Sequence, residues 1–445
     1  MLFGRLIGYD KKGHAMVREM HMRFNPEKIR GVASELRRRR ASRLDLIVPS
    51  SELKVEPDGR VGLSVSGELY KVGDRYSTTY QQAEAYLDEL LQEDPDRRGD
   101  LKIEKSSKTD ISLELNSKAV GQLLTRLEVP VRWGRKFVAK EPDLIYQLVT
   151  GLLERDKRDV LIRAMDGQVR AVLSSSYKPL DSADLFFLLG DAIVKAGGEL
   201  WDARLFDDGF QLLGAAADMV ERVQVDRNFY RDSSPAGDEY FPLYSHSNDD
   251  AGGGSAISNY GVVRKACANG LLLSDPLFTL RHSGADLSKA MGKLMILSAD
   301  TLKKRVELDL AIVRDSVAAV FDPERFKAIL AELQSSVDDK LPEGPKAARL
   351  AVQAAIGFCG LPRNLEDSIL DAMLGSADAS RYGLIQSLTY QSHALSDASP
   401  GLAKDFESAG GKLLKAGDYT KWEAAGIKAY EAMSAGVEEE VLVEA

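Results

Sequence analysis

The centre of the chain has the clearest pattern of alternating apolar and polar residues. Residues 158–181 alternate on both sides of Asp166-Gly167, a dipeptide that favours a two-residue β-hairpin turn. Residues 183–198 have helical spacing of apolar positions and end in Gly197-Gly198, which is typical of a helix C-cap. A second pair of apolar runs, in residues 199–218, flanks Asp208-Gly209. The order hairpin, helix, hairpin predicts an antiparallel sheet with helices packed on one face.

The first hundred residues predict a smaller unit of helices and short strands. A basic helix is expected at residues 26–43, where four consecutive arginines precede Ala41. Short strands are expected at residues 50–80, with a turn at Pro57-Asp58-Gly59, and an amphipathic helix follows them. Residues 93–100, EDPDRRGD, have the composition of an exposed linker, so we place a domain boundary near residue 100.

The rest of the chain predicts helices around a loop-rich segment. Asn116 stands where it can cap a helix, another helix is expected at residues 143–156, and residues 232–260 are loop-like. From Asp286 onward the pattern is almost wholly helical. We therefore predict an α+β protein with an N-terminal unit at residues 1–100, a central α+β domain at 101–285 and a helical unit at 286–445.

Length and composition restrict the class of protein. A chain of 445 residues with 44% hydrophobic and 29% charged residues has the composition of a folded protein with more than one domain. No apolar run is long enough for a membrane span, and the N-terminus lacks a secretory signal pattern, so we expect a cytoplasmic protein without a membrane partner. Only Cys267 and Cys359 occur, which excludes a disulfide framework or a zinc ribbon.

The common signatures of catalysis are missing. The chain has no phosphate-binding glycine motif, and its glycine run at residues 252–254 is typical of a flexible connection. Cys267 lies in an apolar segment, as a small core residue does. A weak candidate for a divalent metal site is His246 with Asp249 and Asp250. We expect no cofactor and favour a protein that is not an enzyme, with catalysis left open.

Basic and aromatic residues are interleaved through the central block, although the net charge is −9. Proteins that hold single-stranded nucleic acid combine cations along the backbone with aromatic faces on which bases stack. The alternative is that the aromatic residues are core and the cations lie solvated at its rim. The candidate nucleic-acid-binding residues are Arg132, Trp133, Arg135, Lys136, Arg163, Arg170, Tyr177, Lys178, Arg264, Lys265, Arg281 and His282.

Several short motifs in this block occur in an order that resembles a known family. They are LLTRLEVPVRWGRKF, LIRAMDGQVRAVLSSSYKPLDSADLF, GGGSAISN, VVRKACANGLLL and TLRHSGAD, within residues 112–290. The block resembles phage- and plasmid-borne proteins catalogued as domain of unknown function number 932. The resemblance implies a mobile genetic element in a bacterial host and supplies no catalytic residue. The matching positions are Arg163, Arg170, Tyr177, Lys178, Arg264, Cys267, Asn269, Gly270, Arg281 and His282.

Three functions remain open from the sequence. The first is a nucleic-acid-binding protein of phage or plasmid DNA metabolism that binds or anneals single-stranded DNA as a homo-oligomer, by analogy with annealing proteins of the Rad-fifty-two type. The second is an oligomeric assembly protein, or one that interferes with host defence, without nucleic-acid binding. The third is a metal-dependent enzyme. The acidic C-terminal VEEEVLVEA is either a contact for a protein partner or a solvated helix end.

Overall fold

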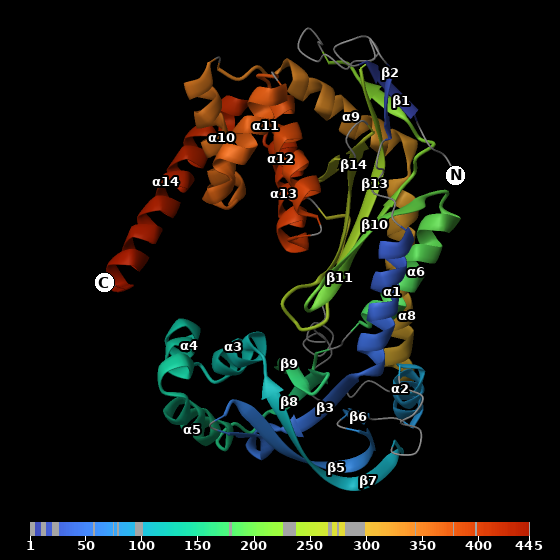
Figure 1. The fold of residues 1–445 in the computed structure, drawn as a ribbon, viewed down its shortest axis with the longest axis vertical. Helices are drawn as coiled ribbons and strands as arrows, with labels where there is room; N and C mark the ends of the chain where they lie inside the picture. The colour runs from blue at the N-terminus through green and yellow to red at the C-terminus, as the bar shows by residue number, and fades with distance from the viewer. Residues whose placement is uncertain are drawn as a thin grey trace.

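The protein is described by a computed structural model that contains two large sheets, one below the other in Figure 1. The structure describes residues 5–9, 15–19, 26–93, 101–177, 180–225, 237–265, 269–280 and 299–444, apart from short gaps at 57, 74, 78–79, 274–275, 343, 377 and 397. A separate hairpin pairs β1 (Arg5–Tyr9) with β2 (Ala15–Glu19).

The first sheet combines strands from two distant parts of the chain. Its order is β3-β8-β9-β7-β5-β4, and β6 pairs with β5. All neighbours are antiparallel except β7 and β9, which are parallel. The strands are β3 (Arg43–Pro49), β4 (Lys54–Val55), β5 (Arg60–Val72), β6 (Arg75–Ser77), β7 (Glu104–Leu115), β8 (Asp159–Met165) and β9 (Gln168–Ser174), and a short 3-10 turn, Ser50–Glu52, follows β3.

Helices cover one face of the first sheet through an apolar core. Leu123 and Leu124 on α3 (Ser117–Arg126) and Ile145 on α5 (Pro142–Leu153) are buried against the strands. Helix α4 (Val131–Lys140) contacts both α3 and α5, and α2 (Tyr80–Glu93) contacts β5. We call this sheet with α2 to α5 the lower unit.

The second sheet is antiparallel throughout and has the order β10-β11-β13-β14-β15. Strand β12 also pairs with β13, and β16 pairs with β14. The strands are β10 (Glu199–Phe206), β11 (Gly209–Ala215), β12 (Glu221–Val223), β13 (Asp238–Asp249), β14 (Ala256–Arg264), β15 (Asn269–Leu272) and β16 (Phe278–Leu280).

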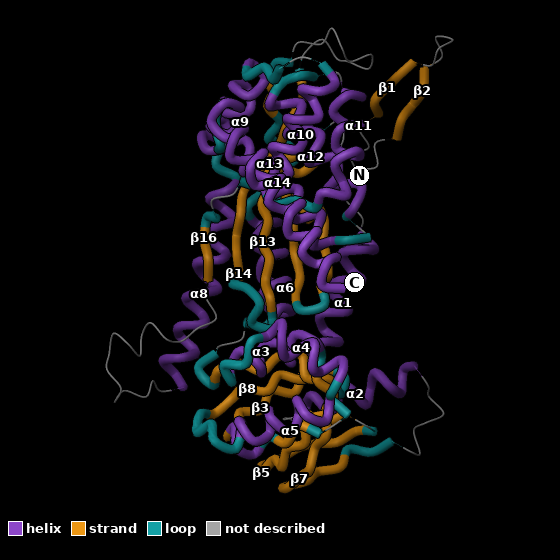
Figure 2. Tube along the Cα trace, turned by 90° about the vertical axis from the view of Figure 1, so that its left-hand side faces the viewer, coloured by secondary structure: helices purple, strands orange, loops and turns teal. Residues whose placement is uncertain are grey.

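Helices lie on both faces of this second sheet, as Figures 1 and 2 show. Helices α6 (Ser182–Lys195) and α8 (Ala299–Val320) pack on one face together with α1 (Pro26–Ala41), and α13 (Pro400–Lys415) packs on the other. Around α13 lie α9 (Pro323–Asp338), α10 (Pro345–Cys359), α11 (Glu366–Ser376), α12 (Arg381–Leu395), α14 (Tyr419–Glu444) and a 3-10 turn, Arg363–Leu365. We call this sheet with all these helices the upper unit.

The structure confirms the predicted α+β class and the helical C-terminal region. Both predicted hairpins form, but β8-β9 belongs to the lower sheet and β10-β11 to the upper one, so they do not share a sheet. The expected boundary near residue 100 falls between β5 and β7, which pair directly. The C-terminal helices pack on the upper sheet, because apolar residues of β14 and β15 share a core with α12 and α13. None of the helices in the described part of the chain has the length and apolar character that a membrane span requires.

Candidate nucleic-acid interface

Helix α4 presents basic and aromatic side chains on the outside of the lower unit. It begins after Pro130, whose fixed backbone angle suits a helix start. Gly134 is buried, and a β-carbon at this position would lie 2.6 Å from the Leu124 Cδ1 atom of α3. Because Gly134, Phe137 and Val138 turn toward the core, the opposite side of α4 faces solvent.

The exposed side of α4 carries four cations, Arg132, Arg135, Lys136 and Lys140. Arg132, Lys136 and Lys140 are four residues apart in succession, which places their side chains in one row along the helix. The Arg135 guanidinium donates a hydrogen bond of 3.2 Å to the Ser117 carbonyl oxygen on α3, which holds it beside this row. The row is therefore positioned by the fold and exposed to solvent.

Trp133 stands beside the cations with 45% of its surface exposed. One side of its indole contacts the Phe137 ring, with the ring centroids 4.3 Å apart and the planes tilted by 37°. Phe137 is itself packed against the core of the lower unit. This contact limits the rotation of the indole and leaves part of it in water, as a stacking surface for a base requires.

Arg163 lies elsewhere and serves a different purpose. Its side chain on β8 is 1% exposed and forms two hydrogen bonds of 2.9 Å to the Asp45 carboxylate on β3. A third, of 2.7 Å, reaches the Asp250 carbonyl oxygen. With these donors engaged inside the protein, Arg163 is not available to neutralise a phosphate.

The remaining predicted residues are not gathered with α4. Arg264 pairs with Asp238 at 2.8 Å, and Lys265 pairs with Glu239 at 2.7 Å, at the far end of the upper sheet. The hydrogen bond from Lys265 and a second one from Arg222 lower the pKa of Glu239. These cations therefore belong to ion pairs of the upper unit.

Two more of the predicted nucleic-acid-binding residues, Arg170 and Tyr177, belong to the lower sheet and its edge, and three lie outside the described residues. Arg170 is partly buried on β9, and the Tyr177 hydroxyl donates a hydrogen bond of 3.4 Å to the Asp249 carbonyl oxygen. Burial raises the pKa of Tyr177. Lys178, Arg281 and His282 lie outside the described residues, as does Cys267. Of the predicted residues that the structure describes, Arg132, Trp133, Arg135 and Lys136 share one exposed surface.

The three candidate metal ligands do not converge on a common point. His246 is fully buried on β13, and its Nδ1 atom lies 3.0 Å from the Ser258 hydroxyl. Asp249 accepts a hydrogen bond of 3.1 Å from Lys118 and others from the backbone N–H groups of Ala251 and Gly253. In the described part of the chain, no three His, Cys, Asp or Glu residues are grouped as metal ligands.

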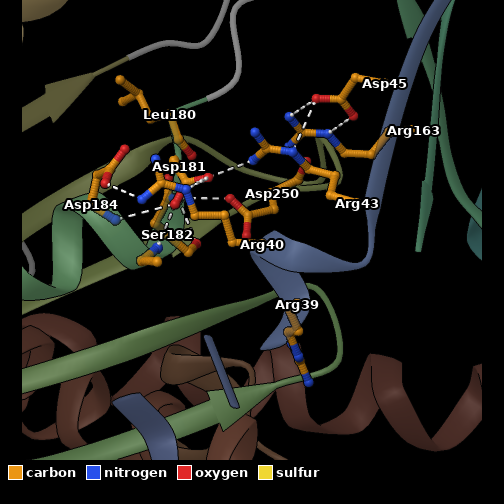
Figure 3. A network of polar contacts seen from close by, with 12 residues as sticks. Arg39, Arg40, Arg43, Asp45, Arg163, Leu180, Asp181, Ser182, Asp184 and Asp250 are labelled. Carbon is orange, nitrogen blue, oxygen red and sulfur yellow. Dashed lines mark hydrogen bonds and ion pairs between the residues drawn. The ribbon is translucent and has the colours of Figure 1, made fainter. Parts of the chain in front are cut away.

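Arg38, Arg39 and Arg40 at the end of α1 form ion pairs within the protein. Arg38 pairs with Asp166 at 3.0 Å, and Arg40 pairs with Asp184 at 2.7 Å. Just beyond the helix, Arg43 pairs with Asp181 at 2.7 Å, and Figure 3 shows the surroundings of Arg40 and Arg43. The basic helix is thus a connector between elements. Lys140 was not among the predicted residues, although its four-residue spacing from Lys136 is the signal that places it in the same row.

Comparison of the chain with models of protein families, with curated proteins and with solved structures finds no match. The resemblance to domain of unknown function number 932 therefore stays a prediction.

Proposed function

We propose that the protein binds single-stranded nucleic acid through the exposed side of α4, without catalysis. The observation that carries the proposal is the row Arg132, Lys136 and Lys140 with the exposed indole of Trp133 beside it. At a rise of about 1.5 Å per residue, cations four positions apart are separated by about 6 Å along the helix, a spacing at which a flexible strand can bring successive phosphates to them. The indole then offers its open side to a base.

The sequence resemblance to phage- and plasmid-borne proteins supports a role for this activity in the DNA metabolism of a mobile element. Proteins carried by phages and plasmids handle DNA that passes through single-stranded stages, so protection or annealing of such strands fits the proposal. Annealing would require two strands to be brought together, which a homo-oligomer with one α4 surface on each copy would achieve.

A second candidate function is that of an assembly protein without nucleic acid. It is favoured by the ion pairs of Arg163, Arg264 and Lys265, which engage three of the expected cations with carboxylates of the protein. The net charge of −9 also opposes general attraction to phosphates. Salt-independent self-association without nucleic-acid binding would select this alternative.

Charge reversal on α4 distinguishes the two candidates. The double variant Arg132→Glu/Lys136→Glu should weaken binding to a labelled single-stranded oligonucleotide by on the order of a hundredfold at low salt, because two attractions become repulsions. The slope of log binding constant against log salt concentration should become shallower by about 1.4. Each phosphate contact on a single strand contributes about 0.7 to this slope, and the variant loses two contacts. Fluorescence anisotropy across a salt series measures both quantities.

A matched control separates local from overall charge. Lys346→Glu/Lys428→Glu changes the net charge by the same amount at exposed positions of α10 and α14 in the upper unit. The control should keep most of the affinity. Equal weakening in both double variants would mean that only overall charge matters, and an unmodified protein that binds no oligonucleotide at low salt would refute the proposal.

Trp133 provides a direct optical test. The chain has three tryptophans, and Trp201 and Trp422 are only 4% and 2% exposed, so among the three indoles a bound base can stack only on that of Trp133. Oligonucleotide binding should quench the fluorescence of this indole. Trp133→Phe should abolish most of the quenching, and Trp133→Ala should cost about 1–3 kcal/mol of binding free energy. Unchanged emission from a saturated complex would show that the indole is not a stacking surface.

A further inference from the structure

Two cations of the α4 row have no carboxylate partner in the part of the chain that the structure describes. Lys136 and Lys140 are exposed and form no ion pair there. By contrast, Arg163, Arg264 and Lys265 each pair with a carboxylate. The chain carries more carboxylates than cations, with a net charge of −9, yet the described fold brings none of them to these two lysines. This part of α4 therefore suits an acidic occupant.

Apolar side chains are exposed on the same pair of helices. Trp133 on α4 is 45% exposed, and α5, which contacts α4, exposes Leu144 and Leu148 by 59% and 42%. The two leucines are four residues apart, so they lie on one side of α5. We call the exposed side chains of these two helices the α4–α5 surface. Its members are Arg132, Trp133, Lys136, Lys140, Leu144 and Leu148.

One segment of the chain has the complementary composition. Residues 437–445, VEEEVLVEA, contain the consecutive glutamates 438–440, followed by the apolar run 441–443, and no Lys or Arg. We call these residues the C-terminal segment. A segment that is both acidic and apolar fits a surface that is both basic and apolar, because opposite charges attract and the same contact removes apolar area from water.

The fold directs this segment toward the α4–α5 surface. Figure 1 shows α14, which contains all but the last residue of the segment, running away from the other C-terminal helices toward α4. In Figure 2, turned by 90°, the end of the chain again lies just above the lower unit. Nine residues span about 14 Å as a helix and up to about 30 Å when extended. Unwinding of the last turns of α14 would therefore extend the reach of the segment without any movement of the upper unit.

We propose that the C-terminal segment binds the α4–α5 surface of its own chain when no nucleic acid is present, and competes with nucleic acid for this surface. Its glutamates supply the carboxylates that Lys136 and Lys140 lack among the described residues. A tethered segment acts at an effective concentration on the order of millimolar, so weak contacts are sufficient. The competition rests on the proposed function, whereas the binding of the segment does not.

Cross-linking of the intact protein with a water-soluble carbodiimide tests the binding of the segment. The reagent activates a carboxylate, a lysine amine displaces the activating group as a urea, and an amide bond forms between groups in contact. We expect an amide between Lys136 or Lys140 and one of the glutamates 438–440, found by mass spectrometry in chains that migrate as monomers. Its yield should fall in about 1 M salt, where the screening length is about 3 Å.

A pair of known geometry provides the positive control. The Lys415 Nζ atom lies 2.6 Å from Glu332 Oε1, and both side chains are partly exposed, so this amide should form in every sample. The absence of the cross-link between α4 and the segment, while the control amide forms, overturns the proposal. A cross-link found only in chains that migrate as dimers also overturns it, because the occupant would then be the segment of a second copy.

Neutralising the segment tests the competition. In the variant Glu438→Gln/Glu439→Gln/Glu440→Gln/Glu444→Gln, the affinity for a labelled single-stranded oligonucleotide should rise about fivefold in about 0.1 M salt, since the competitor loses its charges. Fluorescence anisotropy measures the change. The segment lies at the end of the chain and its glutamates have no part in a core cluster of the described residues, so the variant keeps the fold.

A matched control neutralises four exposed carboxylates of the upper unit and changes the net charge equally. It is the variant Glu199→Gln/Glu221→Gln/Asp338→Asn/Asp371→Asn. Its affinity should change by no more than about twofold, because charges beyond the screening length of about 10 Å contribute little. Equal gains in the two variants overturn the competition. If the cross-link forms while neither the unmodified protein nor the neutralised variant binds the oligonucleotide, the proposed function fails and the binding of the segment stands.

Discussion

Replacing Arg204 with methionine should destabilise the protein by about 3–5 kcal/mol, because the change leaves the buried Glu407 carboxylate without the cation that Arg204 supplies. The Arg204 side chain on β10 is 0% exposed, and so is its partner Glu407 on α13, 2.6 Å away. Asp202, 2% exposed, lies 3.2 Å from the same guanidinium. Denaturant unfolding followed by circular dichroism measures the loss.

An exposed ion pair of the same sheet is the appropriate control. Arg222 on β12 has a side chain that is 51% exposed and pairs with Glu239 at 2.8 Å. Arg222→Met should change the free energy of unfolding by no more than about 1 kcal/mol. If the two arginine variants lost equal stability, burial would not be the cause. The double variant Arg204→Met/Glu407→Met should recover part of the loss, since it removes the stranded Glu407 carboxylate along with the cation.

The second large effect is expected from a single methyl group at Gly411. A β-carbon at this position of α13 would lie 1.8 Å from the Leu272 carbonyl oxygen, so helix and strand would have to separate. Alanine normally favours a helix over glycine by about 1 kcal/mol. At Gly411 the backbone clash should outweigh this helix preference, so the alanine variant should lose about 1–3 kcal/mol or more of its free energy of unfolding.

Gly401 in the same helix gives the opposite prediction. It is exposed and no atom lies within 4 Å of its would-be β-carbon, so Gly401→Ala should be neutral or stabilise by up to about 1 kcal/mol. Thermal unfolding of the two variants side by side measures the difference. A stable Gly411→Ala protein would mean that α13 does not pack this closely on β15.

Local features of the fold could be predicted because short segments determine them. The turn of the β8-β9 hairpin was expected at Asp166-Gly167, and both residues have positive φ, 54° and 75°, as this type of turn requires. Asn116 was expected to cap a helix, and its side chain accepts a hydrogen bond of 2.7 Å from the Ala119 N–H group. Neither prediction depends on distant parts of the chain.

The assignment of strands to sheets could not be predicted in the same way. Strand β3 pairs with β8, and β7 lies parallel to β9, across segments that contain several helices. An alternating pattern shows that a strand has two different faces but does not identify its neighbour. The two hairpins therefore appeared to form one sheet when only their order along the chain was known.

The candidate interface was predictable only in part for a related reason. Residues 132–136 are neighbours in the chain, so they stay together in whatever local structure forms, which here is the helix α4. Arg163 looked equally available, but its partner Asp45 is 118 residues away in sequence. Burial of a cation depends on such distant carboxylates, and 68 Asp and Glu residues offer too many choices for the sequence to identify the right one.

The pairing of early segments with late ones determines the order in which structure can form during synthesis. Arg39 at the end of α1 donates a hydrogen bond of 2.7 Å to the Phe206 carbonyl oxygen, 167 residues further along the chain. Helix α1 also buries Ile29, Val32 and Leu36 in a core that it shares with α6 and β11. These three side chains leave the ribosome long before those partners exist. Helix α1 is therefore made early and packed late, and a chain truncated before β10 contains only part of the native site for this helix.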